Sequence, residues 1–168
     1  TKETWEALLQ RPTQSVEAIE AVVNEVFLAV KQEGDTAVAR YTKQFDNVEL
    51  DSIIVSQKEI TAAIATVSKD LKTAIQQAKS NIEVFHSAQK TIKVDVETQP
   101  GVRCWQDKRP IESVGLYIPG GTAPLFSTVL MLAVPAKIAG CQNIVLCSPP
   151  NAEGVIANEI LYTAALCG

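Results

Sequence analysis

Residues 113–150 read SVGLYIPGGTAPLFSTVLMLAVPAKIAGCQNIVLCSPP, and this stretch decides the fold class. The apolar run at 113–118 predicts a buried strand, which the Pro-Gly-Gly at 119–121 ends. The residues over about 125–139 predict a helix, and a second short strand is expected at 144–147. The stretch therefore predicts a strand, a helix and a second strand in immediate succession.

A last helix is expected over about 154–166, so that strands and helices alternate in the βαβα pattern of an α/β fold with a parallel sheet. A right-handed crossover would place the two strands side by side. Because an open sheet normally needs three or more strands, we expect this unit to be the front portion of something larger. Residues 113–168 contain few charged residues, only Lys137, Glu153 and Glu159. This low charge predicts that the segment is largely buried.

The upstream part has a different composition. Residues 1–99 contain a single glycine and a single proline, and they carry 11 basic and 15 acidic residues against 4 and 4 in 100–168. We therefore predict a domain boundary near Pro110. Residues 1–110 are expected to form a helical segment with a strand pair, as part of the first domain, and 111–168 to begin the sheet domain.

Helical spacing dominates this upstream part. Apolar residues from Val16 to Val30 share one helical face, Gly34 should end that helix, and a second helix is expected over 35–45. Ser56 and Glu59 form a capping-box pattern at the start of another helix. A further helix carries a narrow apolar seam that suits antiparallel packing against a neighbouring helix, with a coiled coil as the alternative: Leu71, Ile75, Ala78, Ile82 and Phe85.

The period then changes to that of strands. Alternation at 94–96, a Pro-Gly turn at 100–101 and an extended pattern over 102–105 predict a hairpin or a strand pair.

Composition excludes several classes of function. The net charge of -4 argues against a dedicated nucleic-acid binder. The four cysteines form no CxxC pair and there is one histidine, so no zinc site is apparent. The opening TKETWEALLQ lacks the apolar core of a signal peptide, and Pro-Gly-Gly at 119–121 breaks the uncharged run that a membrane span would need. Dispersed cysteines fit a reducing, cytoplasmic compartment.

The loop after the first strand is the candidate ligand site. Its spacing from Gly115 to Thr122 nearly matches a phosphate-binding P-loop, but Gly121 stands where the lysine is required. The dinucleotide fingerprint G-x-G-x-x-G is absent as well. A glycine-rich turn before a helix still offers backbone N–H groups to an anion, and Tyr117 could lie against a flat ring. The alternative is a tight turn with Tyr117 as packing.

Thiols and the histidine favour structural roles. Cys147 lies at the carboxyl end of its strand, where a nucleophile would need a helix N-terminus or a cation to lower its pKa. We expect Cys147, Cys141 and Cys167 to be small buried hydrophobes and Cys104 to be an interior strand thiol. His86 has no supporting carboxylate placed by the sequence, which favours packing or solvent exposure over catalysis. The residues alone thus indicate an incomplete α/β ligand-binding unit without a visible catalytic set.

Two segments carry a resemblance to a known family. The stretch 99–150, with GLYIPGG at 115–121 and LCSPP at 146–150, closely resembles histidinol dehydrogenase. The upstream NIEVFHSAQ at 81–89 and VDVETQPGVRC at 94–104 match it too. The resemblance covers essentially the whole chain, is closest to the bacterial form, and identifies the chain as the N-terminal part of such an enzyme.

The resemblance implies an NAD-dependent, zinc-requiring oxidoreductase that converts L-histidinol to L-histidine through histidinaldehyde, at the end of histidine biosynthesis. It implies a homodimer with intertwined subunits and incomplete Rossmann-like domains, of which 111–168 would be the first half of one that binds NAD. Tyr117 would contact NAD, with Pro119 and Gly120 beside it. The zinc ligands and the Glu–His base pair would lie in a downstream part, so no catalytic or metal residue is assigned to this chain and the chain alone should be inactive.

Two alternatives stay open at this point. One is an NAD-linked aldehyde dehydrogenase with Cys147 or Cys104 as its nucleophile. The other is a non-enzymatic α/β ligand-binding module, in which the helical segment serves assembly.

Overall fold

The computed structural model describes residues 5, 9, 16–120 and 123–168. The opening decapeptide lies mostly outside the described residues, and so do Gly121 and Thr122 of the candidate loop. The chain forms two compact units, Thr1–Ile53 and Ile54–Gly168. The domain boundary expected near Pro110 stays a prediction.

The first unit contains α2 (Val16–Glu33) and α3 (Asp35–Asp46). Gly34 separates them with a φ of 60°, a left-handed value that glycine adopts without strain, so the predicted end of the first helix is confirmed. The hydroxyl of Tyr41 in α3 donates to Glu25 Oε1 in α2 at 3.1 Å, which ties the helices together. An apolar groove between them is lined by Val22, Val23, Val26, Phe27, Val30 and Phe45.

The second unit begins with α4 (Gln57–Thr66) and α5 (Lys69–Ala88). The predicted capping box is confirmed: Glu59 N donates to Ser56 Oγ at 3.2 Å, and Ser56 N donates to Glu59 Oε2 at 2.7 Å. Hydrogen bonds from the hydroxyl and the backbone of Ser56 hold the pKa of the Glu59 carboxyl below its usual value. Two orphan donors at the helix start are thereby satisfied.

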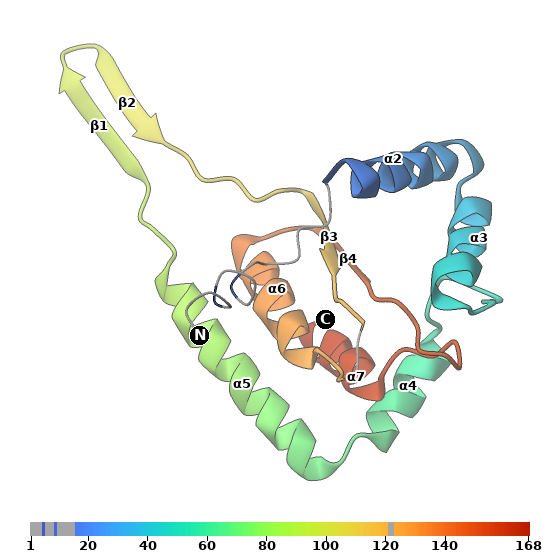
Figure 1. Ribbon diagram of the computed structural model, residues 1–168. Helices are drawn as coiled ribbons and strands as arrows, with labels where there is room; N and C mark the ends of the chain where they lie inside the picture. The colour runs from blue at the N-terminus through green and yellow to red at the C-terminus, as the bar shows by residue number, and fades with distance from the viewer. Residues whose placement is uncertain (1–4, 6–8, 10–15, 121–122) are drawn as a thin grey trace. The chain divides into compact units, whose positions relative to one another are not determined.

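A parallel strand pair forms the centre of the second unit. β3 (Ser113–Tyr117) and β4 (Asn143–Cys147) pair in register from Ser113↔Asn143 to Tyr117↔Cys147. α6 (Phe126–Ala139) connects them and α7 (Asn158–Cys167) follows, so the βαβα order and the α/β class are confirmed (Figure 1).

The last helix starts four residues later than the sequence predicts. Gly154 has a φ of 77°, which does not fit a right-handed helix. The Asn151 side chain instead organises a turn, because its Oδ1 accepts hydrogen bonds from Glu153 N at 3.1 Å and Val155 N at 2.9 Å. The helix can begin only after this turn.

Two apolar clusters place α6 in the middle of the unit. Val129 and Ala133 of α6 meet the strands and α7 in one cluster, which includes Leu116, Ile118, Leu146 and Ile160. Leu130 and Val134, on the adjacent side of α6, meet α5 and α7 in the other, which includes Val67, Leu71, Ile75, Ala78, Ile82 and Tyr162. The sheet, α6 with α7, and α5 are therefore successive layers.

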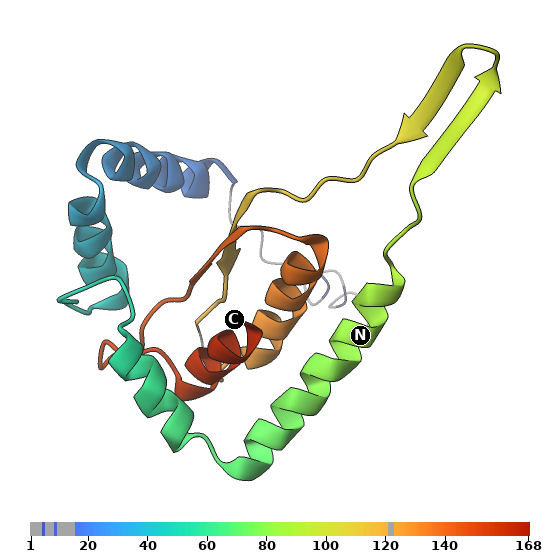
Figure 2. The same cartoon turned by 180° about the vertical axis from the view of Figure 1, so that it is seen from behind.

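The predicted seam of α5 thus packs against α6 and α7, but the expected antiparallel arrangement is wrong. α5 and α6 run in the same general direction in both views (Figures 1 and 2). Phe85, the last residue of the seam, is exposed and belongs to neither cluster.

The predicted hairpin is also confirmed. β1 (Val94–Gln99) and β2 (Val102–Gln106) are antiparallel, with Val96 opposite Cys104, and every residue of both strands is exposed. In Figure 1 the hairpin projects away from the helices of its own unit, α4 to α7, and from the parallel strands.

The expectation that 113–168 is largely buried is wrong for one face of the sheet. Leu116, Ile118 and Leu146 point into a cluster, whereas Tyr117 and Val145 on the other face are 63% and 61% exposed. Low charge therefore predicts that the sheet is apolar, but among the described residues helices cover only one of its two faces. None of the described helices is both long and apolar enough to cross a membrane.

Candidate functional site

The carboxyl ends of β3 and β4 bring two loops together. Tyr117 and Cys147, the last residues of the two strands, lie opposite each other. Ile118 N then donates to Cys147 O at 2.8 Å, which extends the pairing one residue beyond the strands. The loops that follow therefore start side by side, at the edge where α/β sheets bind their ligands.

These two loops make a close contact at Gly120. A Cβ on Gly120 would lie 2.7 Å from Pro149 Cγ, a separation that real Cβ atoms essentially never show, and 3.7 Å from Pro149 Cβ, which is an ordinary contact. Only glycine fits there without displacing one loop. The sequence shows both loops but not this contact, because it joins residues far apart in the chain; the Pro-Gly composition of the two loops is the one signal that points to it.

The three residues predicted to meet a cofactor lie together at this edge. Tyr117 presents its ring on the open face of the sheet, and Pro119 and Gly120, which follow after the buried Ile118, are exposed. Gly121, the other glycine of the turn, lies outside the described residues. The structure thus brings the predicted set to one accessible place, and its role in cofactor binding stays a prediction.

The start of α6 faces the same edge, since it follows the β3 loop (Figure 1). Its cap residue Leu125 forms no side-chain capping bond, and its first turn holds no acidic residue. The N-terminal N–H groups of a helix and its positive dipole end favour anions. This helix start is therefore electrostatically suited to the phosphate groups of a nucleotide.

The predicted burial of the cysteines fails for two of the four. Cys104 and Cys147 are exposed, so the interior positions expected for these two are wrong, whereas Cys141 and Cys167 are partly buried. Burial raises the pKa of the Cys167 thiol, and the nearby Lys79 ammonium opposes that effect. Cys147 lies at the loop edge and Cys104 lies on the hairpin, so the structure does not bring the two proposed nucleophiles together.

His86 lies near the end of α5, not at the sheet edge. Its Nδ1 is 2.7 Å from Gln89 Oε1, and its ring meets Phe85 edge-on with 5.3 Å between centroids. Over the described part of the chain, no three His, Cys, Asp or Glu side chains are grouped so that they could hold a metal ion.

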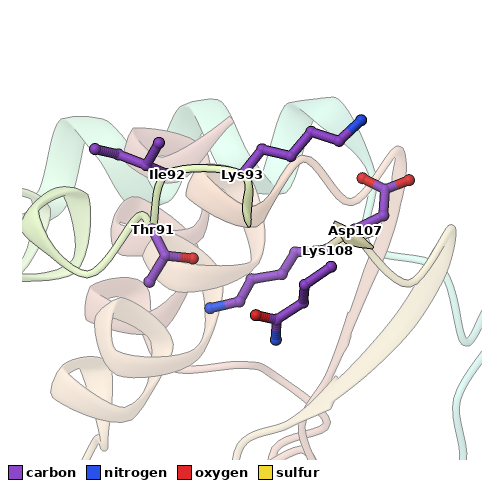
Figure 3. A pocket seen from close by; sticks show the side chains of 6 residues that line it. Thr91, Ile92, Lys93, Asp107 and Lys108 are labelled. Atoms are coloured by element: carbon purple, nitrogen blue, oxygen red, sulfur yellow. The ribbon is translucent and has the colours of Figure 1, made fainter. Parts of the chain in front are cut away.

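A hollow with a volume of about 130 Å³ lies at the base of the hairpin. Its lining residues are Thr91, Ile92, Lys93, Gln106, Asp107 and Lys108, all of them exposed. Figure 3 shows that the Lys93 and Lys108 side chains extend in different directions, and Asp107 accepts a hydrogen bond from Arg109 Nε at 3.1 Å. Without convergent charges this hollow is a weaker candidate than the sheet edge.

Known proteins resemble this chain along its whole length. The family model described as histidinol dehydrogenase matches residues 9–168. The histidinol dehydrogenase of Yersinia pestis is 56% identical over 169 residues, which cover 100% of this chain and 37% of that protein. A putative histidine biosynthesis bifunctional protein of Photorhabdus laumondii is 54% identical over 167 residues, which cover 99% of this chain and 20% of that protein.

A solved structure agrees with these matches. The crystal structure of histidinol dehydrogenase from Elizabethkingia anophelis superposes with a TM-score of 0.89 at 55% identity, over 99% of this chain and 38% of that one. The chain thus spans well under half the length of the proteins it matches. The resemblance stated from GLYIPGG and LCSPP is confirmed, and neither alternative function is favoured. The chain belongs to the histidinol dehydrogenase family, an oxidoreductase family of histidine biosynthesis, and corresponds to its N-terminal part.

Proposed function

We propose that this chain is the part of an NAD-dependent enzyme that holds NAD at the carboxyl edge of β3 and β4, while the complete enzyme oxidises L-histidinol to L-histidine through histidinaldehyde. The observation that carries the proposal is that Tyr117, Pro119 and Gly120 lie at one accessible sheet edge, in a chain that matches the family over residues 9–168.

The residues of this edge fit a dinucleotide. An exposed tyrosine ring offers a flat surface on which a nucleotide ring can stack. Gly120, which has no side chain, leaves room for the Pro149 ring, so that the two loops meet closely beside the tyrosine. The uncapped start of α6 suits a pyrophosphate. When bound, NAD supplies a hydride acceptor; this chain's contribution is to bind and orient it.

Zinc has no comparable site among the residues that the structure describes. These residues supply no cluster of nitrogen, sulfur and oxygen ligands, of which a zinc ion needs about four. We therefore assign the zinc ligands and the groups that accept the substrate proton to the part of the family's length that this chain does not span.

Three further properties belong to the same proposal. Residues 111–168 form the first half of an incomplete Rossmann-like NAD-binding domain, the complete enzyme is a homodimer, and it works in the cytoplasm on a small-molecule substrate. The parallel βαβα order supports the domain assignment. The homodimer and the compartment rest on the family alone.

Tyr117→Ala in the full-length enzyme tests the cofactor site. Stacking of a base on an aromatic ring contributes about 1–3 kcal/mol, so the KM for NAD should rise by about tenfold or more. The KM for histidinol should stay within about twofold, because the ring does not hold the alcohol. Tyr117→Phe keeps the ring and serves as the control, with a KM for NAD close to that of the parent. Equal losses for NAD and histidinol would remove Tyr117 from the cofactor site.

The isolated chain provides a second test. Residues 1–168 with added zinc should form no NADH from histidinol, because the proton-accepting groups and the zinc ligands are assigned elsewhere. Absorbance of NADH at high protein concentration measures this directly. Turnover above the buffer rate would show that the reactive groups lie within this chain.

A further inference from the structure

We infer that Gly120 and Pro149 form a matched pair that sets the spacing of the two loops at the sheet edge, and that Pro149 is a positioning residue for NAD. The inference rests on the proposed NAD site and adds to it a residue from the second loop. Pro149 acts through Gly120 rather than by touching the cofactor.

The contact is too tight to absorb a methyl group. The 2.7 Å between a Cβ on Gly120 and Pro149 Cγ lies far inside the ordinary van der Waals range. Pro149 cannot rotate its side chain away, because its ring is closed onto the backbone nitrogen. Pro150 follows it and further restricts the backbone of Pro149. An alanine at position 120 must therefore move a backbone segment.

The second loop is the less able of the two to move. Pro149 is partly buried, and the turn that follows it is fixed by hydrogen bonds to Asn151: its Oδ1 accepts from Glu153 N and Val155 N, and its own N donates to Val155 O at 3.0 Å. We therefore expect the first loop to be displaced.

The displaced segment is confined to the proposed cofactor site. Upstream, Ile118 is fully buried and its N–H is held by Cys147 O, and downstream α6 is packed from Phe126 onward. Movement therefore falls on Pro119 and Gly120, just beyond the held Ile118. These are two of the three residues proposed to lie beside NAD, so a clash at Gly120 should appear in the affinity for NAD.

A double-variant cycle in the full-length enzyme tests the pair. Gly120→Ala should raise the KM for NAD about tenfold, equivalent to about 1.4 kcal/mol, and leave the KM for histidinol within about twofold. Pro149→Ala removes Cγ and Cδ and should raise the KM for NAD about two- to threefold by loosening the spacing. In Gly120→Ala/Pro149→Ala the nearest remaining atom is Cβ at 3.7 Å, so the KM for NAD should return to within about threefold of the parent.

Gly115→Ala is the matched control. Gly115 lies in β3, five residues before Gly120, and a Cβ there meets nothing within 4 Å. The same glycine-to-alanine change should leave the KM for NAD within about twofold.

The outcomes separate this inference from the proposed function. A parent enzyme whose turnover does not depend on NAD would overturn the proposed function and the pair with it. An NAD-dependent parent whose Gly120→Ala variant is unimpaired would overturn the pair alone. A double variant as weak as Gly120→Ala would do the same, because Gly120 would then act through its own backbone. Equal loss of affinity for NAD and histidinol in Gly120→Ala would show that the contact supports the fold in general and does not position the loop for NAD.

Discussion

The second unit contains two strand pairs that differ in almost every physical respect. β1 and β2 form an antiparallel hairpin joined by a tight turn, and all of its residues are exposed. β3 and β4 are parallel, joined through α6, and one of their faces packs against α6 and α7. Local pairing alone is enough to build the first pair, whereas the second exists only because helices cover one of its faces.

The comparison indicates where stability and function reside. A two-stranded hairpin is marginal in water because it buries little apolar surface. The parallel pair has a packed layer beneath it, so its carboxyl edge can hold two loops in fixed contact. The candidate site therefore lies on the pair that is anchored, and we expect changes in the hairpin to leave that site undisturbed.

The same substitution in both regions gives the largest expected difference. Val129 in α6 is fully buried and Val96 in β1 is 50% exposed. Val129→Ala should lower the free energy of unfolding by about 2–3 kcal/mol, through lost burial and a residual cavity. Val96→Ala should change it by no more than about 0.5 kcal/mol. Urea unfolding of the 168-residue chain, followed by circular dichroism, measures both; similar losses would break the comparison.

Replacing a glycine of positive φ by alanine should have an intermediate effect on stability. The effect should be local in the hairpin and global in the packed layer. Gly101 in the hairpin turn has a φ of 84°, and Gly140 at the end of α6 has a φ of 93°. Alanine at either position should cost about 1 kcal/mol or more, because a Cβ is strained there. In Gly101→Ala the loss should appear as faster amide exchange confined to β1 and β2, whereas in Gly140→Ala it should lower the global unfolding midpoint. A global effect of Gly101→Ala would show that the hairpin unfolds together with the rest.

The smallest effect concerns the ion pair on the hairpin. Arg103 donates to both carboxylate oxygens of Asp95, at 2.6 and 2.7 Å, and this bond raises the pKa of the Arg103 guanidinium. Because the Arg103 side chain is 72% exposed, Asp95→Asn should speed amide exchange of the hairpin by only about twofold, and about 1 M salt should abolish the difference. An effect that persists at high salt would mean that hydrogen-bond geometry, not charge, holds the pair.

Features set by neighbouring residues in the chain could be predicted well. Gly34, the Ser56–Glu59 capping box and the turn at Gly101 each depend on the local backbone, and the structure has all three where the sequence predicts them. The parallel βαβα order was predictable too, because a strand, a helix and a strand in succession leave few topologies.

Features that depend on distant partners could not be predicted. The direction of α5 relative to α6 follows from how apolar faces meet, not from the seam of α5 itself. Low charge in 113–168 did not show which sheet face α6 and α7 would cover. At the site, the sequence singles out Tyr117, Pro119 and Gly120, whose role in cofactor binding stays a prediction. The contact of Gly120 with Pro149 could not be predicted, because it requires the strand register to be known.

The in-register ending of β3 and β4 also has a practical consequence for anyone handling this polypeptide. Within the described residues each strand has one neighbour, so the outer N–H and C=O groups of both remain available beside the bare side chains of Tyr117 and Val145. Such an open sheet edge can pair with an extended peptide, including a strand of a second copy of this chain. The 168-residue chain should therefore aggregate at high concentration by pairing at this edge, and Val145→Lys should delay the onset of turbidity.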